Sequence, residues 1–255
     1  MGALHEGHAS LVRCAKATCS FVAASVFVNP LQFNNPEDLR TYPRTPQEDL
    51  SLLESVGCDL VFIPDSPDEV FGSPNHSTPY DGGISTKILE GAFRPGHFEG
   101  VFKVVRCLFD LFNPDKAFFG EKDFQQCFLI REMSRQLFPQ LDIIQCPTLR
   151  DSDGLAMSSR NKRLSPDERR DATLIYRGMH EAASLPDGTP AEQLRATFES
   201  VIHQSTFIRC EYLALVNEET LQEEAFLNRA VPQRLLTAVY CNSIRLIDTL
   251  KVQSQ

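Results

Sequence analysis

The first 148 residues alternate between helix-like and strand-like spacing of apolar side chains. Residues 6–19 place Leu11, Val12 and Ala15 on one helical face, whereas residues 20–28 form a short apolar run typical of a buried strand. The alternation continues with helix-like residues 45–57, 98–112 and 123–137 and strand-like residues 59–63, 116–119 and 141–146. Strands that alternate with helices predict a parallel sheet covered by helices on both faces.

Polar segments separate these elements. Residues 29–44 predict a loop, and residues 64–86, rich in Pro, Gly, Ser and Asp, predict an irregular segment. Between them, Thr45 and Glu48 have the spacing of a capping box with Pro46 at the first helical position, so we expect a helix to begin there.

The pattern changes near residue 150, where we expect a domain boundary. Ser165 and Glu168 form a second capping box, which is expected to open a helix that runs to about residue 184. Residues 211–216 and 235–240 are strand candidates with helical segments before and between them. This order predicts a smaller α+β domain after the α/β domain.

Composition excludes several classes of protein. A chain of 255 residues with 42% hydrophobic and 23% charged residues is neither disordered nor fibrous. A formal net charge of −9 disfavours a general binder of nucleic acids or membrane surfaces. No run approaches the roughly 20 apolar residues of a membrane span, and the N-terminal residues do not resemble a signal peptide. The eight cysteines form no C-x-x-C pair, which favours reduced thiols in the cytoplasm.

The N-terminal segment MGALHEGH places His5 and His8 three residues apart at the mouth of the first predicted helix. Gly2 and Gly7 let a ligand approach the backbone, and a helix N-terminus offers unpaired N–H groups and the positive end of the dipole. Imidazoles placed there can donate hydrogen bonds to phosphate oxygens. A metal-binding pair and a pair of surface histidines would show the same spacing.

The segment GEKDFQQ, residues 120–126, follows the carboxyl end of a predicted strand, which is where open α/β sheets bind ligands. Lys122 can neutralise a phosphate, and Asp123 can hold a ribose or a metal-bound water. Asp123 and Gln126 also have the spacing of a capping box, and the two interpretations can hold together for different atoms.

Two further polar segments are candidates for ligand contacts. In MSSRN, residues 157–161, the hydroxyls of Ser158 and Ser159 and the guanidinium of Arg160 suit a triphosphate, although a solvated linker has the same composition. In NPLQF, residues 29–33, amide side chains can position a small polar substrate or simply form a turn.

Taken together, these segments resemble the pantothenate synthetase (pantoate–β-alanine ligase) family. The resemblance rests on MGALHEGH, SVFVNPLQF, PEDL…YPRT, LEGAFRPGHFEGV, FFGEKDFQQ and DGLAMSSRN, which follow the family's order and cover residues 1 to about 165 closely. The C-terminal part matches more loosely and ends in the RLID of residues 245–248.

The family belongs to the HIGH-motif nucleotidyltransferase superfamily. The resemblance therefore implies a Rossmann-like ATP- and pantoate-binding domain at residues 1–148 and a smaller C-terminal α+β lid domain at residues 149–255. It implies that the pantoate carboxylate attacks the α-phosphate of ATP and that the β-alanine amine then releases AMP. It also implies Mg²⁺ with unassigned ligands, a cytoplasmic homodimer, and small-molecule substrates without nucleic acid or membrane.

The resemblance assigns the nucleotide contacts residue by residue. It implies that His5 and His8 contact ATP phosphates, with His8 as proton donor, and that Lys122 and Arg160 complete the catalytic set. The residues it implies in ATP binding are Met1, Gly2, Ala3, Leu4, His5, Glu6, Gly7, His8, Gly120, Glu121, Lys122, Asp123, Leu149, Met157, Ser158, Ser159 and Arg160.

The resemblance also assigns the smaller substrates. It implies that Gln32 and Gln126 bind pantoate as a buried amide pair, and that Gln32 also binds β-alanine. We expect an apolar group to pack the gem-dimethyl of pantoate, although the same side chains would serve as plain core: Val101, Val104, Val105 and Phe119.

The family carries a helix and a strand, ending in Pro-Thr, before its MG-x-LH segment, whereas this sequence starts at Met1 of that segment. We therefore expect the parallel sheet to lack an inner strand and to expose unpaired edges. Either the start codon was placed at an internal Met of a longer gene, or the chain is a shortened, weakly active or inactive nucleotide-binding paralogue. A different adenylyl transferase is a further alternative.

Overall fold

The computed structural model describes residues 2–72 and 79–252, and the chain forms two compact units. Unit 1 comprises the chain up to Gly120 together with Gln125–Pro147, and unit 2 comprises Glu121–Phe124 and the chain from Thr148 onwards. The chain therefore leaves unit 1 for four residues, returns to it at Gln125, and leaves it finally at Thr148.

Unit 1 alternates short strands with helices, as the apolar pattern predicts. Its strands are β1 (Ala23–Ser25), β2 (Leu60–Phe62), β3 (Lys116–Gly120) and β4 (Asp142–Cys146). Its helices are α1 (Glu6–Lys16), α2 (Pro36–Thr41), α3 (Pro46–Ser55), α4 (Pro67–Phe71), α5 (Glu90–Phe93), α6 (His97–Phe112) and α7 (Phe124–Leu137), whose first residue belongs to unit 2. Two 3₁₀ turns, η1 (Pro30–Gln32) and η3 (Gly83–Thr86), also lie in the described part of unit 1.

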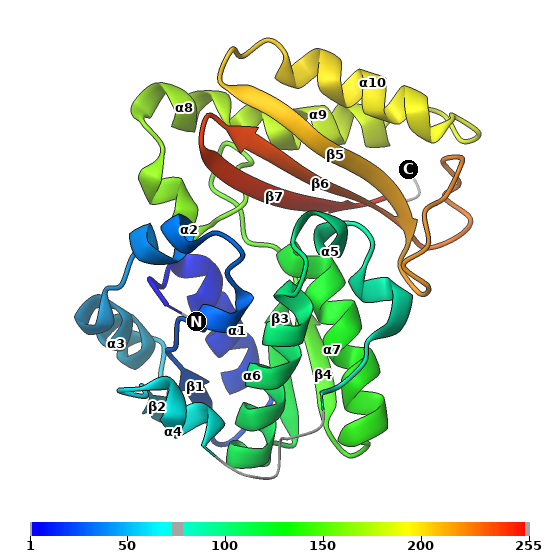
Figure 1. The fold of residues 1–255 in the computed structure, drawn as a ribbon. Coiled ribbons are helices and arrows are strands. Elements are labelled where there is room, and N and C mark those ends of the chain that lie inside the picture. The colour runs from blue at the N-terminus through cyan, green and yellow to red at the C-terminus, as the bar shows by residue number, and fades with distance from the viewer. Residues whose placement is uncertain (1, 73–78, 253–255) are drawn as a thin grey trace. The chain divides into compact units, whose positions relative to one another are not determined.

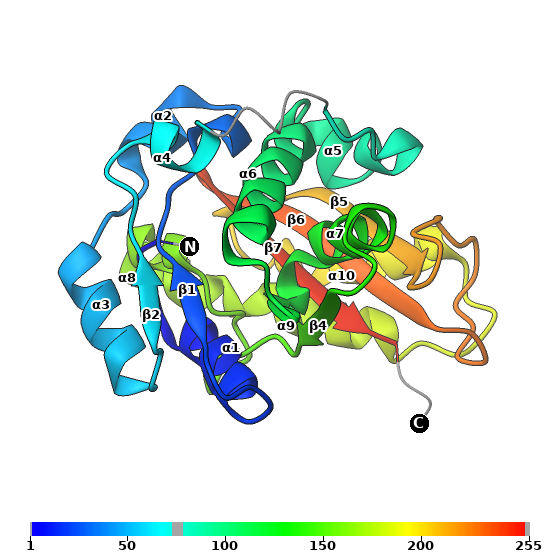
Figure 2. The same ribbon diagram turned by 90° about the horizontal axis from the view of Figure 1, so that it is seen from below.

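The four strands of unit 1 form two parallel pairs, β1 with β2 and β3 with β4. Helix α1 lies beside both pairs (Figure 1, Figure 2). Its residues Val12 and Ala15 share one apolar cluster with Ala24 of β1, Leu53 of α3 and, at the edge, Phe118 of β3. The predicted α/β class with parallel strands is confirmed, but in the described residues the two pairs do not join into one continuous sheet.

Three local predictions for unit 1 are wrong. The Thr45 side chain caps no N–H of α3 and donates instead to Asp49 at 3.0 Å, so the expected capping box does not form. The predicted loop 29–44 contains η1 and α2, and the predicted irregular segment 64–86 contains α4 and η3; residues 73–78 lie outside the described residues. Helices α2 and α4 each begin at a proline, whose fixed φ suits the first helical position.

Unit 2 packs helices against one face of a three-stranded antiparallel sheet (Figure 1). The sheet has the order β5 (Ile208–Asn217), β6 (Gln233–Cys241), β7 (Ile244–Lys251). The helices are α8 (Pro166–Asp171), α9 (Thr173–Ala183) and α10 (Ala191–Ile202), with 3₁₀ turns η4 (Glu121–Asp123) and η5 (Ser159–Arg163). Met179 of α9 and Phe198 of α10 meet Leu235 and Val239 of β6 in the core.

The capping box at Ser165 and Glu168 is confirmed, with the Ser165 N–H donating to Glu168 Oε2 at 2.7 Å and the Glu168 N–H donating to Ser165 Oγ at 3.3 Å. The helix that it opens is shorter than predicted, because α8 ends at Asp171 and α9 begins at Thr173. Strand β7 was not predicted from the alternation of apolar residues. It carries the RLID segment, in which Asp248 is a buried ion-pair partner rather than a solvent-facing residue.

Candidate active site

The two histidines cap the first helix of unit 1. Nδ1 of His5 accepts a hydrogen bond from the Gly7 N–H at 3.1 Å, and the His5 N–H donates to Nδ1 of His8 at 3.3 Å. The two ring centroids lie 4.1 Å apart. A ring nitrogen that accepts a hydrogen bond carries no proton, so each neutral ring holds its proton on Nε2. Both imidazoles therefore have an Nε2–H donor at the positive end of the helix dipole.

A buried carboxylate holds the turn that precedes the histidines. Asp49 of α3 is 2% exposed, and its two oxygens accept the Ala3 N–H at 3.0 Å and the Leu4 N–H at 2.7 Å. Ala3 has a φ of 48°, a left-handed conformation that costs free energy for a residue with a Cβ. Sequence reasoning missed Asp49. Its position four residues before the buried Leu53, and so on the same helical face, was the available signal.

The other residues of MGALHEGH also make contacts within unit 1. Gly2 lies so close to Val28 that an added Cβ would be 2.7 Å from Val28 Cγ2. Glu6 forms an exposed ion pair with Arg13 of the same helix. Met1, which the resemblance places in ATP binding, lies outside the described residues.

The GEKD segment spans the two units. Gly120 ends β3, whereas Glu121 to Asp123 form η4 in unit 2. The carboxylate of Glu121 accepts hydrogen bonds from the Thr148 N–H at 3.2 Å and from Arg234 at 3.1 Å. Lys122 is half-buried and Asp123 is exposed, and neither makes an ion pair within the part of the chain that the structure describes.

The MSSRN segment begins where a loop of unit 2, residues 149–157, closes on itself. The Met157 N–H donates to the carbonyl of Leu149 at 3.0 Å, and Arg150 and Ala156 form an antiparallel bridge. The Leu149 carbonyl therefore has a partner inside the loop, whereas its side chain is exposed.

The predicted phosphate-binding side chains follow in one turn. Ser158 is the N-cap of η5, and its hydroxyl accepts the Arg160 N–H at 3.3 Å. Ser159 is 4% exposed. A 3₁₀ turn that begins with two serines and an arginine collects hydroxyl and guanidinium donors on a short stretch of backbone, which suits an anionic ligand.

Two arginines fix this loop within unit 2. Arg150 forms a bidentate ion pair with Asp248, at 2.7 and 2.9 Å. Arg169 pairs with Asp153 at 2.9 Å and with Asp151 at 2.8 Å. The hydrogen bond from Arg169 holds the pKa of Asp153 below its ordinary value of 3.8.

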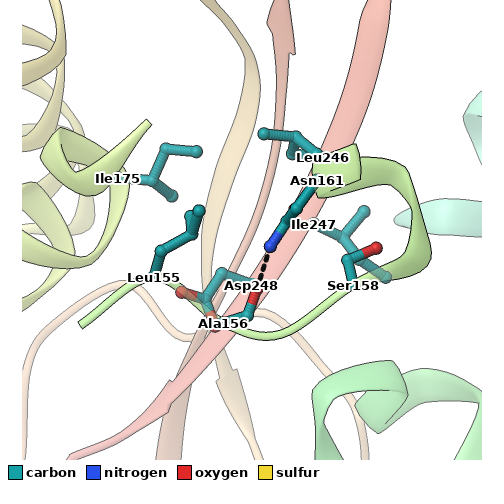
Figure 3. Close-up of a pocket in the computed structure, with 8 residues that line it drawn as sticks. All are labelled: Leu155, Ala156, Ser158, Asn161, Ile175, Leu246, Ile247 and Asp248. Atoms are coloured by element: carbon teal, nitrogen blue, oxygen red, sulfur yellow. Dashed lines mark hydrogen bonds between the residues drawn. The ribbon is translucent and has the colours of Figure 1, made fainter. Parts of the chain in front are cut away.

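A cavity of about 10 Å³ lies between the loop, α9 and β7 (Figure 3). The Asn161 amide reaches into this region and donates from Nδ2 to the Ala156 carbonyl at 3.0 Å. Its Oδ1 is buried and has no hydrogen-bond partner within the described residues. The cavity has room for about one water molecule, which is far too little for a nucleotide. Its lining residues are Leu155, Ala156, Ser158, Asn161, Ile175, Leu246, Ile247 and Asp248.

The first predicted pantoate ligand, Gln32, ends η1 in unit 1. Its carbonyl accepts hydrogen bonds from Nδ1 of His97 at 2.8 Å and from Arg94 at 3.1 Å. The Gln32 side chain is half-buried rather than buried. Sequence reasoning did not assign a role to His97, although the GAFRPGHFEG segment belonged to the resemblance.

A buried asparagine ties η1 to α6. Asn29 is 2% exposed, its Nδ2 donates to the Gly100 carbonyl at 3.0 Å, and its Oδ1 accepts the Leu31 N–H at 3.1 Å. A Cβ added at Gly100 would lie 2.3 Å from the Leu31 carbonyl oxygen, so only glycine allows this approach.

The second predicted pantoate ligand, Gln126, is half-buried on the first turn of α7, and the buried amide is its neighbour Gln125. Gln125 accepts the Glu90 N–H at 2.9 Å and donates to the carbonyls of Ser85 and Ile88. It therefore organises residues 85–90 of unit 1, a role that the sequence did not predict. Of the apolar candidates, Val101, Val104 and Val105 are buried and Phe119 is half-buried.

No metal cage or membrane span occurs in residues 2–72 and 79–252. Within those residues no three His, Cys, Asp or Glu side chains are grouped to hold a metal ion. No helix there is long and apolar enough to cross a membrane. The metal-pair interpretation of His5 and His8 therefore lacks a third ligand.

An α/β unit with two imidazole donors at a helix N-terminus, and a second unit with a serine- and arginine-bearing turn, suit an enzyme that binds a nucleotide. The family model described as "Pantoate-beta-alanine ligase" matches residues 1–251. The chain belongs to this pantoate–β-alanine ligase family.

Individual relatives agree with that assignment. The pantothenate synthetase of Paracoccus denitrificans (strain Pd 1222) is 46% identical over 253 residues, which are 99% of this chain and 88% of the relative. The crystal structure of pantothenate synthetase from Thermus thermophilus matches with a TM-score of 0.91 at 39% identity, covering 100% of this chain and 91% of that chain. Pantoate-beta-alanine ligase from Francisella tularensis, in complex with beta-gamma ATP and beta-alanine, matches with a TM-score of 0.81 at 35% identity, covering 100% and 88%.

Proposed function

We propose that this chain condenses pantoate with β-alanine at the expense of ATP, giving pantothenate, AMP and diphosphate through a pantoyl-adenylate intermediate. The family match over residues 1–251 is the observation that carries the proposal. The Francisella tularensis relative, whose crystal holds beta-gamma ATP and beta-alanine, supports the substrate class. Both half-reactions need positioning and charge neutralisation more than covalent catalysis by the protein.

In the first half-reaction a carboxylate oxygen of pantoate bonds to the α-phosphorus and the bond to diphosphate breaks. His5 and His8 contact the phosphates, because the acceptor role of each Nδ1 leaves the proton on Nε2 and the helix N-terminus favours an anion. The resemblance assigns His8 as the proton donor, and because its Nδ1 accepts the His5 N–H, the neutral ring serves that role as a hydrogen-bond donor to the phosphates through Nε2–H. Asp49 keeps the two rings at this position through its bonds to the preceding backbone.

Lys122 and Arg160 place positive charge beside the polyphosphate, and the hydroxyls of Ser158 and Ser159 donate hydrogen bonds to it. As the α-phosphate is attacked, charge shifts towards the departing diphosphate, and donors aimed there lower the barrier. The remaining nucleotide contacts come from residues 2–7 and 120–123, from Met157 and from the backbone of Leu149.

In the second half-reaction the β-alanine amine attacks the acyl carbon and the bond from that carbon to the AMP oxygen breaks. Gln32 and Gln126 bind pantoate, and Gln32 also binds β-alanine. The anchoring of η1 by Asn29 supports this role, since it fixes the backbone that carries Gln32. The resemblance implies a nucleotide- and pantoate-binding domain at residues 1–148 and a smaller lid domain at residues 149–255, and the two compact units support this division except that Glu121–Phe124 and Thr148 belong to unit 2.

ATP is used as its Mg²⁺ complex. Mg²⁺ in nucleotide sites keeps several water ligands and is held by one or two carboxylates together with substrate phosphates, so its binding would not require a cluster of three protein ligands. Bound there, it neutralises charge on the polyphosphate. The enzyme works as a cytoplasmic homodimer, and the eight free cysteines are compatible with a reducing compartment.

The test is to incubate the chain with ATP, Mg²⁺, pantoate and β-alanine and to measure pantothenate and AMP by mass spectrometry. We expect both products only when all three substrates are present. A folded chain that binds ATP but forms no pantothenate would instead support the non-catalytic nucleotide-binding alternative. Turnover with an acid other than pantoate would support a different adenylyl transferase.

A further inference from the structure

We infer that Arg234 of β6 is a positioning residue that fixes Lys122 and Asp123 by holding the residue on either side of them. The inference rests on the proposed function, in which Lys122 neutralises ATP phosphate. All the groups involved belong to unit 2.

The Arg234 side chain is buried, with 4% of its surface exposed. Its Nη2 donates to Glu121 Oε2 at 3.1 Å, and its Nε donates to Glu218 Oε1 at 2.8 Å. Its Nη1 donates to the hydroxyl of Thr249 at 3.3 Å, and the guanidinium carbon lies 4.6 Å from the ring centroid of Phe124. One guanidinium therefore binds both Glu121 and Phe124.

These two contacts enclose a dipeptide. Glu121 and Phe124 directly flank Lys122 and Asp123, and the four residues form the short stretch that joins unit 2 while the chain on both sides belongs to unit 1. An ion pair at one end and a cation–π contact at the other fix the backbone between them more tightly than either contact alone.

The geometry also reassigns Glu121. Both of its oxygens have protein partners, Oε1 the Thr148 N–H and Oε2 the Arg234 guanidinium. We therefore place Glu121 among the residues that orient Lys122, and not among those that touch ATP through their side chains.

Arg234 has a second carboxylate partner that supplies a matched control. Glu218 accepts from the same guanidinium and lies 3.5 Å from the Nζ of Lys251, but within the described residues no hydrogen bond or ion pair joins it directly to the GEKD segment. A purely structural role for Arg234 predicts that losing either carboxylate has the same effect. A positioning role predicts that only the loss of Glu121 affects nucleotide binding.

The experiment compares Glu121→Gln with Glu218→Gln, measuring the Kd for ATP by calorimetry, KM for ATP and kcat. We expect Glu121→Gln to raise the Kd and KM for ATP about tenfold and Glu218→Gln to leave both within about twofold, with similar losses of thermal stability. Equal effects of the two variants on ATP would overturn the inference.

A double-mutant cycle separates positioning from direct contact. Arg234→Gln should raise KM for ATP in the wild-type background but add little to Glu121→Gln, and Arg234→Lys should recover part of the loss. Additive effects of Arg234→Gln and Glu121→Gln would mean that Glu121 contacts ATP independently, which contradicts the inference.

The experiment gives a result even if one variant does not fold or the wild-type chain is inactive. If Arg234→Gln does not fold, the comparison of Glu121→Gln with Glu218→Gln still decides. If the wild-type chain makes no pantothenate, the proposed function fails, while the Kd for ATP continues to test the positioning role separately.

Discussion

The buried carboxylate of Asp49 should be worth several kcal/mol to unit 1, and Asp49→Asn tests this directly. The wild-type carboxylate accepts the Ala3 N–H at 3.0 Å and the Leu4 N–H at 2.7 Å, with the Thr45 hydroxyl as a third donor. Asparagine keeps one acceptor oxygen, but its NH₂ group replaces the second oxygen. Because NH₂ is itself a donor, the backbone N–H that faces it loses its acceptor. Hydrogen bonds to a charged group contribute about 1.5–3 kcal/mol each, so we expect a loss of about that size.

Asp49→Ala removes both backbone bonds and should cost about 3–6 kcal/mol on the same basis. The assay is urea unfolding followed by circular dichroism, with Glu54→Gln as the control, because Glu54 is an exposed carboxylate on the same helix. The control should stay within about 0.5 kcal/mol of wild type. If Asp49→Asn also stays within that margin, Asp49 does not hold the turn before His5.

Three other predictions concern separate parts of the chain. Gly100→Ala should raise KM for pantoate, because the new Cβ would lie 2.3 Å from the Leu31 carbonyl oxygen; steady-state kinetics with an unchanged KM would argue against this packing. Arg160→Ala should slow the formation of diphosphate from ATP about a hundredfold with little change in Tm. A parallel loss of Tm would indicate a structural role. Arg169 lowers the pKa of Asp153 below 3.8, so the Asp153 contribution to stability is present above about pH 4 and is lost as pH falls through the lowered pKa. Thermal unfolding from pH 6 to pH 3 should therefore show wild type and Asp153→Asn converging at low pH, and a constant difference would contradict the assignment.

The long periodic elements were accessible from sequence because their own residues specify them. Helix α6 was expected at residues 98–112 and occurs at His97–Phe112, where Phe98, Val101 and Val105 face the core. Strand β3 was expected at residues 116–119 and occurs at Lys116–Gly120. In these segments the apolar spacing and the burial agree, so local pattern and tertiary packing point to the same structure.

The failures occur where a distant partner overrides the local pattern. Thr45 has the spacing of an N-cap, but Asp49 offers its hydroxyl a buried charged acceptor, and that bond replaces the cap. Strand β7 was missed because Asp248 interrupts its apolar alternation, and the charge of that buried carboxylate is balanced by Arg150, 98 residues away.

The residues of the candidate site divide in the same way, into those that lie in short motifs and those that depend on distant partners. The resemblance names the histidines and the Ser158–Arg160 turn as candidates, because each is a short contiguous motif. It did not locate Asp49, Gln125 or Arg234, whose contacts span tens of residues and follow no local spacing. Supporting residues of this kind become visible only when the fold brings their partners together.

In the proposed reaction, a pantoate carboxylate oxygen attacks the α-phosphate of ATP. The most direct measurement uses pantoate labelled with ¹⁸O in its carboxylate, together with ATP, Mg²⁺ and β-alanine, followed by mass spectrometry of the nucleotide product. Because the bond from the acyl carbon to oxygen breaks in the second half-reaction, we expect AMP that carries one ¹⁸O atom. Formation of ADP and labelled inorganic phosphate, or of pantothenate with unlabelled AMP, would contradict it.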